Sequence, residues 1–160
     1  MKRILVLAVI VLMTATVPAT AQRHHCESVS GSLITNISLI PFGPVGTNLG
    51  PAFGDLAGSV AATITSTSPF TVQHYWVATN GDTINFKPAL LKPTFIPGNP
   101  NAVVALWGDY RADIAGGTGK FKDATGYIEA FGLVDFDSLT TTLRYRGEVC
   151  YVDMTPSEKK

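Results

Sequence analysis

The sequence predicts an all-β protein folded as a single antiparallel β-barrel of eight strands, with a β-sandwich as the alternative arrangement. No long stretch places apolar residues at helical spacing. Thr, Val, Ile and aromatic residues, which favour strands, are frequent, and Gly, Pro and Asn residues divide the chain into segments of strand length. Because no helix is expected to cover a sheet, the strands must bury their own apolar faces, either in a barrel or between two packed sheets.

The first 21 residues predict a cleavable signal peptide. A basic start at Lys2 and Arg3 precedes the apolar run ILVLAVIVLM, and Ala19-Thr20-Ala21 has the small-x-small pattern that signal peptidase accepts. The run is too short for a transmembrane helix, which needs about 20 residues, so an uncleaved anchor is the weaker alternative. The sequence therefore predicts a secreted protein, periplasmic or extracellular, with one barrel domain over residues 22–160 and no membrane attachment after cleavage.

Seven or eight strands are expected between turn signals. The clearest segments are 31–40, 55–68, 70–79, 83–92, 102–114, 126–136 and 139–152. Loops are expected over 41–54 and 97–101, where Gly, Pro and Asn are frequent. The Asn80-Gly81 pair predicts a tight hairpin because both residues tolerate positive φ, and Pro88 predicts a sheet edge, a bulge or a break in its strand.

The segment 102–114 is the element that most favours a closed barrel. As one long strand, it would carry an apolar interior face opposite a polar exterior face. The interior face would consist of Val104, Leu106, Gly108, Tyr110, Ala112 and Ile114, and the exterior face of Trp107, Asp109, Arg111 and Asp113. Tyr110 is therefore the candidate ligand-binding residue. Glycines inside this and other strands fit the bends of strongly curved strands.

Two cysteines, Cys26 and Cys150, lie near the two ends of the mature chain. In an oxidising compartment an even pair usually joins, whereas two free thiols are the alternative. A bridge would close a loop of more than a hundred residues and stabilise the fold by about 4–5 kcal/mol in the chain-entropy model. It would also require the two ends of the chain to lie side by side.

The charge balance argues against two classes of partner. Without Lys2 and Arg3, ten basic and twelve acidic residues remain, and no basic stripe is present. Nucleic acid and anionic membrane surfaces both require clustered Lys and Arg, so neither is expected as a partner. No cofactor and no metal are expected either.

The densest motif in the chain is the glycine-rich segment IAGGTGKFKDATG, residues 114–126. A phosphate-binding P-loop requires Ser or Thr after Gly-Lys, but Gly119 and Lys120 are followed by Phe121. A dinucleotide fingerprint requires a third glycine where this sequence has Lys122, and no helical pattern follows. The glycines therefore predict a tight connection between two strands, with Phe121 tucked beneath it.

The same segment resembles the signature of the allene oxide cyclase and dirigent barrels. The matching positions are Ile114, Gly116, Gly117, Gly119, Phe121, Ala124 and Gly126, and the later segment TTLRYRGEV resembles the last strand of those families. The resemblance implies an eight-stranded antiparallel barrel with an apolar cavity, often assembled as a trimer. In these families the cavity holds a reactive lipid epoxide or steers phenoxy radical coupling.

The chain departs from the dirigent pattern at two positions. Dirigent proteins often place an acidic residue and an Arg where this sequence has Lys120 and Thr125. The resemblance therefore implies the fold without implying the family's pocket chemistry.

Two further residues are candidates for chemistry. Glu129 stands in an otherwise apolar strand, and burial inside a barrel would raise its pKa and make it an acid or base. The alternative, which we favour, is that its neighbours point inward and Glu129 is solvated. His74 shares a strand face with Trp76 and is interpreted as a hydrogen-bonded surface residue.

Three functions are consistent with these features. The favoured one is a secreted, non-catalytic barrel that binds a small apolar molecule. The second is an isomerase or cyclase that acts on a lipid-like substrate through an acid such as Glu129. The third is a structural or interaction protein with a solid barrel and an exposed aromatic patch that includes Trp107.

Overall fold

The computed structural model describes residues 24–38 and 46–152, which form strands joined by turns and one short 3₁₀ helix. The elements, in chain order, are β1 (His24–Ser38), β2 (Thr47–Gly54), β3 (Gly58–Thr67), β4 (Phe70–Ala78), β5 (Thr83–Phe86), β6 (Ala89–Leu90), β7 (Thr94–Ile96), β8 (Asn99–Ala105), β9 (Arg111–Gly117), η1 (Gly119–Phe121), β10 (Thr125–Asp135) and β11 (Thr140–Val152). The predicted signal peptide lies outside the described residues. Within residues 24–38 and 46–152, no helix has the length and apolar character needed to cross a membrane.

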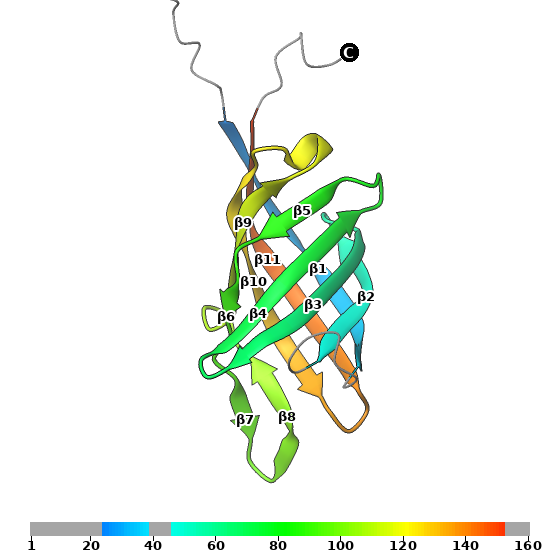
Figure 1. Ribbon diagram of the computed structural model, residues 1–160, viewed down its shortest axis with the longest axis vertical. Helices are drawn as coiled ribbons and strands as arrows, with labels where there is room; N and C mark the ends of the chain where they lie inside the picture. The colour runs from blue at the N-terminus through cyan, green and yellow to red at the C-terminus, as the bar shows by residue number, and fades with distance from the viewer. Residues whose placement is uncertain (1–23, 39–45, 153–160) are drawn as a thin grey trace, which may run out of the picture.

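The strands form a closed, eight-stranded antiparallel barrel (Figure 1). Six of the eight barrel strands are single elements, namely β1 to β4, β10 and β11. The seventh barrel strand is interrupted and consists of β5, β6 and β7 in succession, and the eighth consists of β8 followed by β9. β11 pairs with both β1 and β10, so the sheet closes on itself and no edge separates its first strands from its last. The prediction of a closed eight-stranded barrel is confirmed, and the sandwich alternative is wrong.

The two ends of the barrel differ. β1 begins and β11 ends at one end of the barrel, shown at the top of Figure 1. This end is filled by buried side chains. Phe121 from η1, Leu56 from the β2–β3 turn and Val149 from β11 are each 2% exposed or less. At the opposite end, the β7–β8 hairpin extends beyond the other strands (Figure 1). The interior is therefore closed at the end where β1 begins and β11 ends.

The segment 102–114 is not one continuous strand. A turn with a hydrogen bond from the Asp109 N–H to the Leu106 carbonyl separates β8 from β9, and Gly108 adopts φ +83° within it. The turn shifts the alternation by one residue: Val103 and Ala105 are buried before it, and Tyr110, Ala112 and Ile114 are buried after it. The predicted interior position of Val104 is wrong for this reason, whereas that of Tyr110 agrees with the structure.

Two predicted loops contain strands. Residues 47–54 form β2 although they include two glycines and a proline, because β1 and β3 offer backbone partners on both sides. Residues 99–101 begin β8, which pairs with β7. Pro88 lies between β5 and β6, where the seventh barrel strand is interrupted.

Candidate functional site

Two adjoining cavities occupy the barrel interior. The central cavity, about 70 Å³, lies between the closed end and the middle of the barrel and is lined by Leu33, Trp76, Phe86 and Tyr145 among others. The distal cavity, about 60 Å³, lies toward the opposite end and is lined by Ile37, Phe70, Val103 and Phe136 among others. The cavities share five lining residues, Asn48, Ala62, Tyr110, Thr141 and Leu143. The barrel is therefore not filled by its own side chains.

His74 and Tyr110 form a buried polar pair on the wall of the central cavity. The Nε2 atom of His74 lies 2.5 Å from the Tyr110 hydroxyl, and the imidazole packs edge-on against Phe86 at 5.9 Å between ring centroids. Burial lowers the pKa of His74 from 6.5 to about 4 and raises the pKa of Tyr110. At neutral pH both side chains are therefore uncharged, and their contact is a neutral hydrogen bond.

The second ring nitrogen of His74 decides which atom donates this hydrogen bond. Nδ1 is buried and has no hydrogen-bond partner among the described residues. A buried N–H without an acceptor is rarer than an unused lone pair, so we assign the imidazole proton to Nε2. Nε2–H then donates to the Tyr110 oxygen, and the Tyr110 O–H proton remains available to a molecule in the cavity.

A second polar group lies across the interior from this pair. The Asn48 side-chain amide donates to the Thr141 hydroxyl at 3.2 Å, which joins β2 to β11 across the intervening β1. Thr35 on β1 is buried, and its hydroxyl has no partner among the described residues. Two polar side chains nearer the closed end bond to the backbone: Trp76 Nε1 donates to the Leu56 carbonyl, and the Tyr145 hydroxyl donates to the Phe53 carbonyl and accepts from the Leu56 N–H.

The structure places the two candidate residues on opposite sides of the barrel wall. Tyr110 lines both cavities. Glu129 points outward, because its neighbours Ile128 and Ala130 line the central cavity. Its carboxylate accepts hydrogen bonds from Arg146 at 3.1 and 3.3 Å, and its side chain is 17% exposed. Glu129 therefore does not face either cavity.

His74 is the cavity-lining residue that the sequence interpretation misplaced. It lies inside the barrel, not on its surface, between the buried residues Val72 and Trp76 of the same strand face. That alternation was the available signal. No comparable pattern pointed to Asn48, Thr35 or Thr141, because isolated Asn and Thr residues also occur on the outer faces of strands.

The aromatic residue Trp107 belongs to an outer cluster whose members cover one another. The Arg146 guanidinium lies 4.5 Å from the Trp107 ring centroid, and Phe131 stacks on the same indole at 5.5 Å. Arg111 lies over Tyr127 in the same way at 3.8 Å. These contacts pair the aromatic rings with neighbours on the barrel's own surface, while Phe131 remains 38% exposed.

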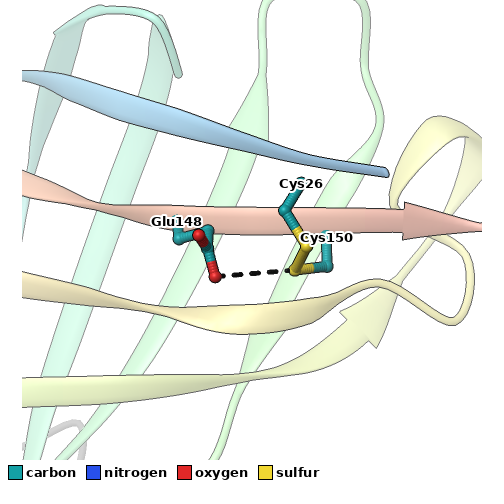
Figure 2. Close-up of side chains that lie close together, drawn as sticks. All are labelled: Cys26, Glu148 and Cys150. Atoms are coloured by element: carbon teal, nitrogen blue, oxygen red, sulfur yellow. Dashed lines mark hydrogen bonds between the residues drawn. A yellow bond between two sulfur atoms is a disulfide. The ribbon is translucent and has the colours of Figure 1, made fainter. Parts of the chain in front are cut away.

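Cys26 and Cys150 form a disulfide between directly paired residues of β1 and β11. Figure 2 shows Glu148 beside this bridge, with its carboxylate 3.7 Å from the Cys150 sulfur. These three residues are the one cluster of metal-ligand types found in the described part of the chain. Because both sulfurs are joined to each other, they cannot act as thiolate ligands, and the cluster is not a metal site.

The glycine-rich motif forms the connection between β9 and β10 at the closed end. Gly119 adopts φ +53° at the start of η1, and a Cβ on Gly117 would lie 1.9 Å from the Thr83 carbonyl oxygen. Phe121 is fully buried and packs on Tyr151 at 5.9 Å. The motif thus closes the barrel with one aromatic side chain, and Gly116 and Gly126 complete the turn at positive φ.

The fold and the cavity define a class of protein: a closed eight-stranded antiparallel barrel with a hollow, mostly apolar interior. No family model and no curated protein matches the chain. Nine chains of solved structures do match, including two described as pterocarpan synthase dirigent proteins. GePTS1 superposes with a TM-score of 0.50 at 15% identity, over 83% of this chain and 94% of its own. PsPTS1 superposes with a TM-score of 0.47 at 14% identity, over 82% of this chain and 97% of its own.

At these identities the likeness concerns the fold alone. It confirms the predicted resemblance to the dirigent and allene oxide cyclase barrels at that level, with a divergent sequence. The activity of the two solved proteins does not transfer with the fold.

Proposed function

We propose that this protein is a secreted binding protein that holds a small apolar molecule inside its barrel. The observation that carries the proposal is the pair of adjoining cavities, whose walls are formed mostly by aliphatic and aromatic side chains. Small-molecule sites are typically concave and apolar, with a few polar groups that orient the ligand. The His74–Tyr110 pair and the Asn48–Thr141 pair supply those polar groups.

The interior residues support binding better than catalysis. The titratable side chains that line the cavities are His74 and the tyrosines, and burial keeps the cavity residues His74 and Tyr110 in their neutral forms at physiological pH. Glu129, the acid that an isomerase or cyclase mechanism would have used, lies outside the barrel. The binding proposal therefore takes precedence over the enzymatic one.

The disulfide supports an extracellular or periplasmic location. Structural disulfides persist in oxidising compartments and are rare in reducing ones. The Cys26–Cys150 bridge agrees with the signal peptide predicted from the sequence. Native mass spectrometry of protein purified from its secretory compartment would show a bound natural ligand directly.

Filling the cavity should abolish binding of an apolar molecule. Ala62 on β3 lines both cavities, so Ala62→Leu places additional atoms where they meet. We expect the affinity for the neutral fluorescent dye N-phenyl-1-naphthylamine to fall at least about tenfold, because the ligand loses its space. A fluorescence titration measures the change. Thr63→Leu, on the next residue of the same strand, is the matched control and should bind the dye normally.

A second part of the proposal is self-association, which the family resemblance predicts as a trimer. The sequence from Ser28 to Phe86 contains only two Asp, Glu, Lys or Arg residues, Asp55 and Asp82, and both lie outside the strands. The outer surface of residues 28–38 of β1 and of β2–β4, called here the uncharged face, therefore carries no Asp, Glu, Lys or Arg. Its exposed large apolar residues are Ile34, Leu49, Phe53, Tyr75 and Val77.

The outer surface on the other side of the barrel has the opposite character. Charged residues are frequent on β9–β11, namely Arg111, Asp113, Glu129, Asp135, Arg144, Arg146 and Glu148. Interface centres are depleted of charged residues, and contiguous exposed apolar patches mark contact sites. This segregation supports association of copies through the uncharged face.

A charge placed on the uncharged face should dissociate the oligomer. Val77 on β4 is 44% exposed and lines neither cavity, so Val77→Asp leaves the barrel interior intact while introducing an unpaired carboxylate into the contact. We expect sedimentation velocity to show conversion to monomer, whereas Leu133→Asp on the opposite side of the barrel leaves the assembly unchanged. A wild-type protein that is monomeric at all concentrations would contradict this part of the proposal.

A further inference from the structure

We propose that the ligand is an uncharged, elongated molecule with a hydrogen-bond acceptor oxygen near its middle, such as an internal ketone. This inference rests on the proposed binding function and specifies its chemistry. It follows from where the polar groups lie along the barrel interior, and from the absence of charge on the described walls of both cavities.

The polar side chains gather where the two cavities meet. Asn48, Tyr110 and Thr141 each line both cavities, and we call these three residues the polar belt. On the distal side the wall is apolar, formed by residues such as Ile64, Val72, Leu91 and Phe136. A molecule that spans both cavities therefore passes from the apolar distal cavity through the polar belt into the central cavity.

On the other side of the polar belt, the central cavity is also largely apolar. Its wall includes Leu33, Val60, Phe86 and Ile128. Tyr145 and Trp76, whose polar atoms lie toward the closed end, direct those atoms to backbone partners. An oxygen at the end of a ligand would therefore reach no free partner in these two residues, whereas an oxygen at the middle would reach the polar belt.

The polar belt offers donors. Tyr110 has an O–H proton that the His74 bond does not use under the tautomer assigned above. Thr141 accepts a bond from Asn48, which leaves its own O–H to donate, and the Asn48 amide has a second N–H. Donors on two sides of the interior are suited to a carbonyl oxygen, which accepts two hydrogen bonds.

The ligand must also be neutral. No Asp, Glu, Lys or Arg lines either cavity among the described residues. Placing an unpaired carboxylate in an apolar interior costs several kcal/mol or more. A free fatty acid would therefore bind more weakly than a ketone of the same length.

Four nine-carbon probes test this inference: 5-nonanone, 2-nonanone, nonane and nonanoate at pH 7. Their affinities are measured by displacement of N-phenyl-1-naphthylamine from the full mature protein. We expect 5-nonanone to bind about tenfold more tightly than 2-nonanone or nonane, which corresponds to one well-formed hydrogen bond. Nonanoate should be the weakest of the oxygen-containing probes.

Variants of the polar belt connect this preference to named atoms. Tyr110→Phe and Thr141→Val each remove a hydroxyl with little change of shape, so they should bring the 5-nonanone to nonane affinity ratio close to one. Thr142→Val, on the outward face of β11, is the matched control and should retain the full ratio. Circular dichroism verifies that each variant is folded.

The outcomes separate the inference from the proposed function. Equal affinity for 5-nonanone, 2-nonanone and nonane would overturn the role of the polar belt while leaving apolar binding intact. Tighter binding of nonanoate would overturn the requirement for a neutral ligand. If neither the dye nor any probe binds the folded protein, the proposed function itself is wrong.

Discussion

Removal of the Cys26–Cys150 bridge is expected to lower the free energy of unfolding by about 5 kcal/mol, which for many domains is a third or more of the total. The two cysteines are 124 residues apart in sequence, so the bridge constrains nearly the whole unfolded chain. In the chain-entropy model the stabilisation grows with the length of the closed loop. In the folded state the same two residues are already direct neighbours in the β1–β11 pairing, so the bridge adds little new order there.

Urea unfolding of the Cys26→Ser, Cys150→Ser double variant measures this effect, with the wild type titrated in parallel with and without dithiothreitol. The double variant and the reduced wild type should show the same loss of stability, because both lack the cross-link. The double variant should still bind N-phenyl-1-naphthylamine under conditions in which it is folded, since the bridge lies on the outer surface away from the cavities. A loss of less than about 1 kcal/mol would mean that residual structure in the unfolded chain already holds these ends together.

The parts of the fold that the sequence predicted are those with local signals. Three kinds of local pattern predicted the eight-stranded barrel: the Asn80-Gly81 pair, the glycine motif around Phe121, and the segments rich in β-branched residues. Each pattern depends only on residues that are neighbours in the sequence. The cysteine pair was similarly informative, because an even pair of cysteines that follows a predicted signal peptide has few alternatives.

The parts that could not be predicted depend on contacts between distant segments. Residues 102–114 alternate well enough to read as one strand, but β10 pairs with β8 and β9 separately, and the turn at Gly108 lies between these pairings. β2 is a strand because it has neighbours on both sides, not because of its composition.

The candidate site shows the same division. Tyr110 was identified from the alternation around it, and it lines the cavities. His74 also alternates with buried residues, but a lone histidine on a strand is usually solvated, and this general tendency outweighed the pattern. Asn48 and Thr141 become a pair only because β1, which pairs with β2 on one side and with β11 on the other, brings these distant segments close together.

His74 should make the barrel sensitive to acid. Its pKa is about 4 in the folded protein, lowered from 6.5 because burial disfavours the imidazolium. Between these two pH values the unfolded chain binds a proton at His74 that the folded barrel does not, so stability falls as the pH falls. Integrated over the window from about pH 6.5 to pH 4, the loss attributable to His74 approaches about 3 kcal/mol.

The comparison between His74→Gln and the wild type isolates this contribution. Glutamine does not titrate and can still bond to the Tyr110 hydroxyl, so the variant should lose less stability between pH 7 and pH 4 than the wild type does. Exposed carboxyl groups such as Asp135, whose pKa is lowered by its hydrogen bond from the Ser138 side chain, also lose native interactions on acidification. Because they act in both proteins, they cancel in the difference. His24→Gln, at the exposed start of β1, should behave as the wild type.

The same substitution also tests the assigned proton positions. If Nε2–H of His74 donates to Tyr110, the amide N–H of the substituted glutamine can replace that donor, and the Tyr110 O–H stays free for a ligand in the variant. Affinity for 5-nonanone should then be nearly unchanged at pH 7, while the acid sensitivity is reduced. Identical pH profiles for the variant and the wild type would instead place the imidazole in contact with water, and the His74–Tyr110 pair could not then be a closed, neutral element of the cavity wall.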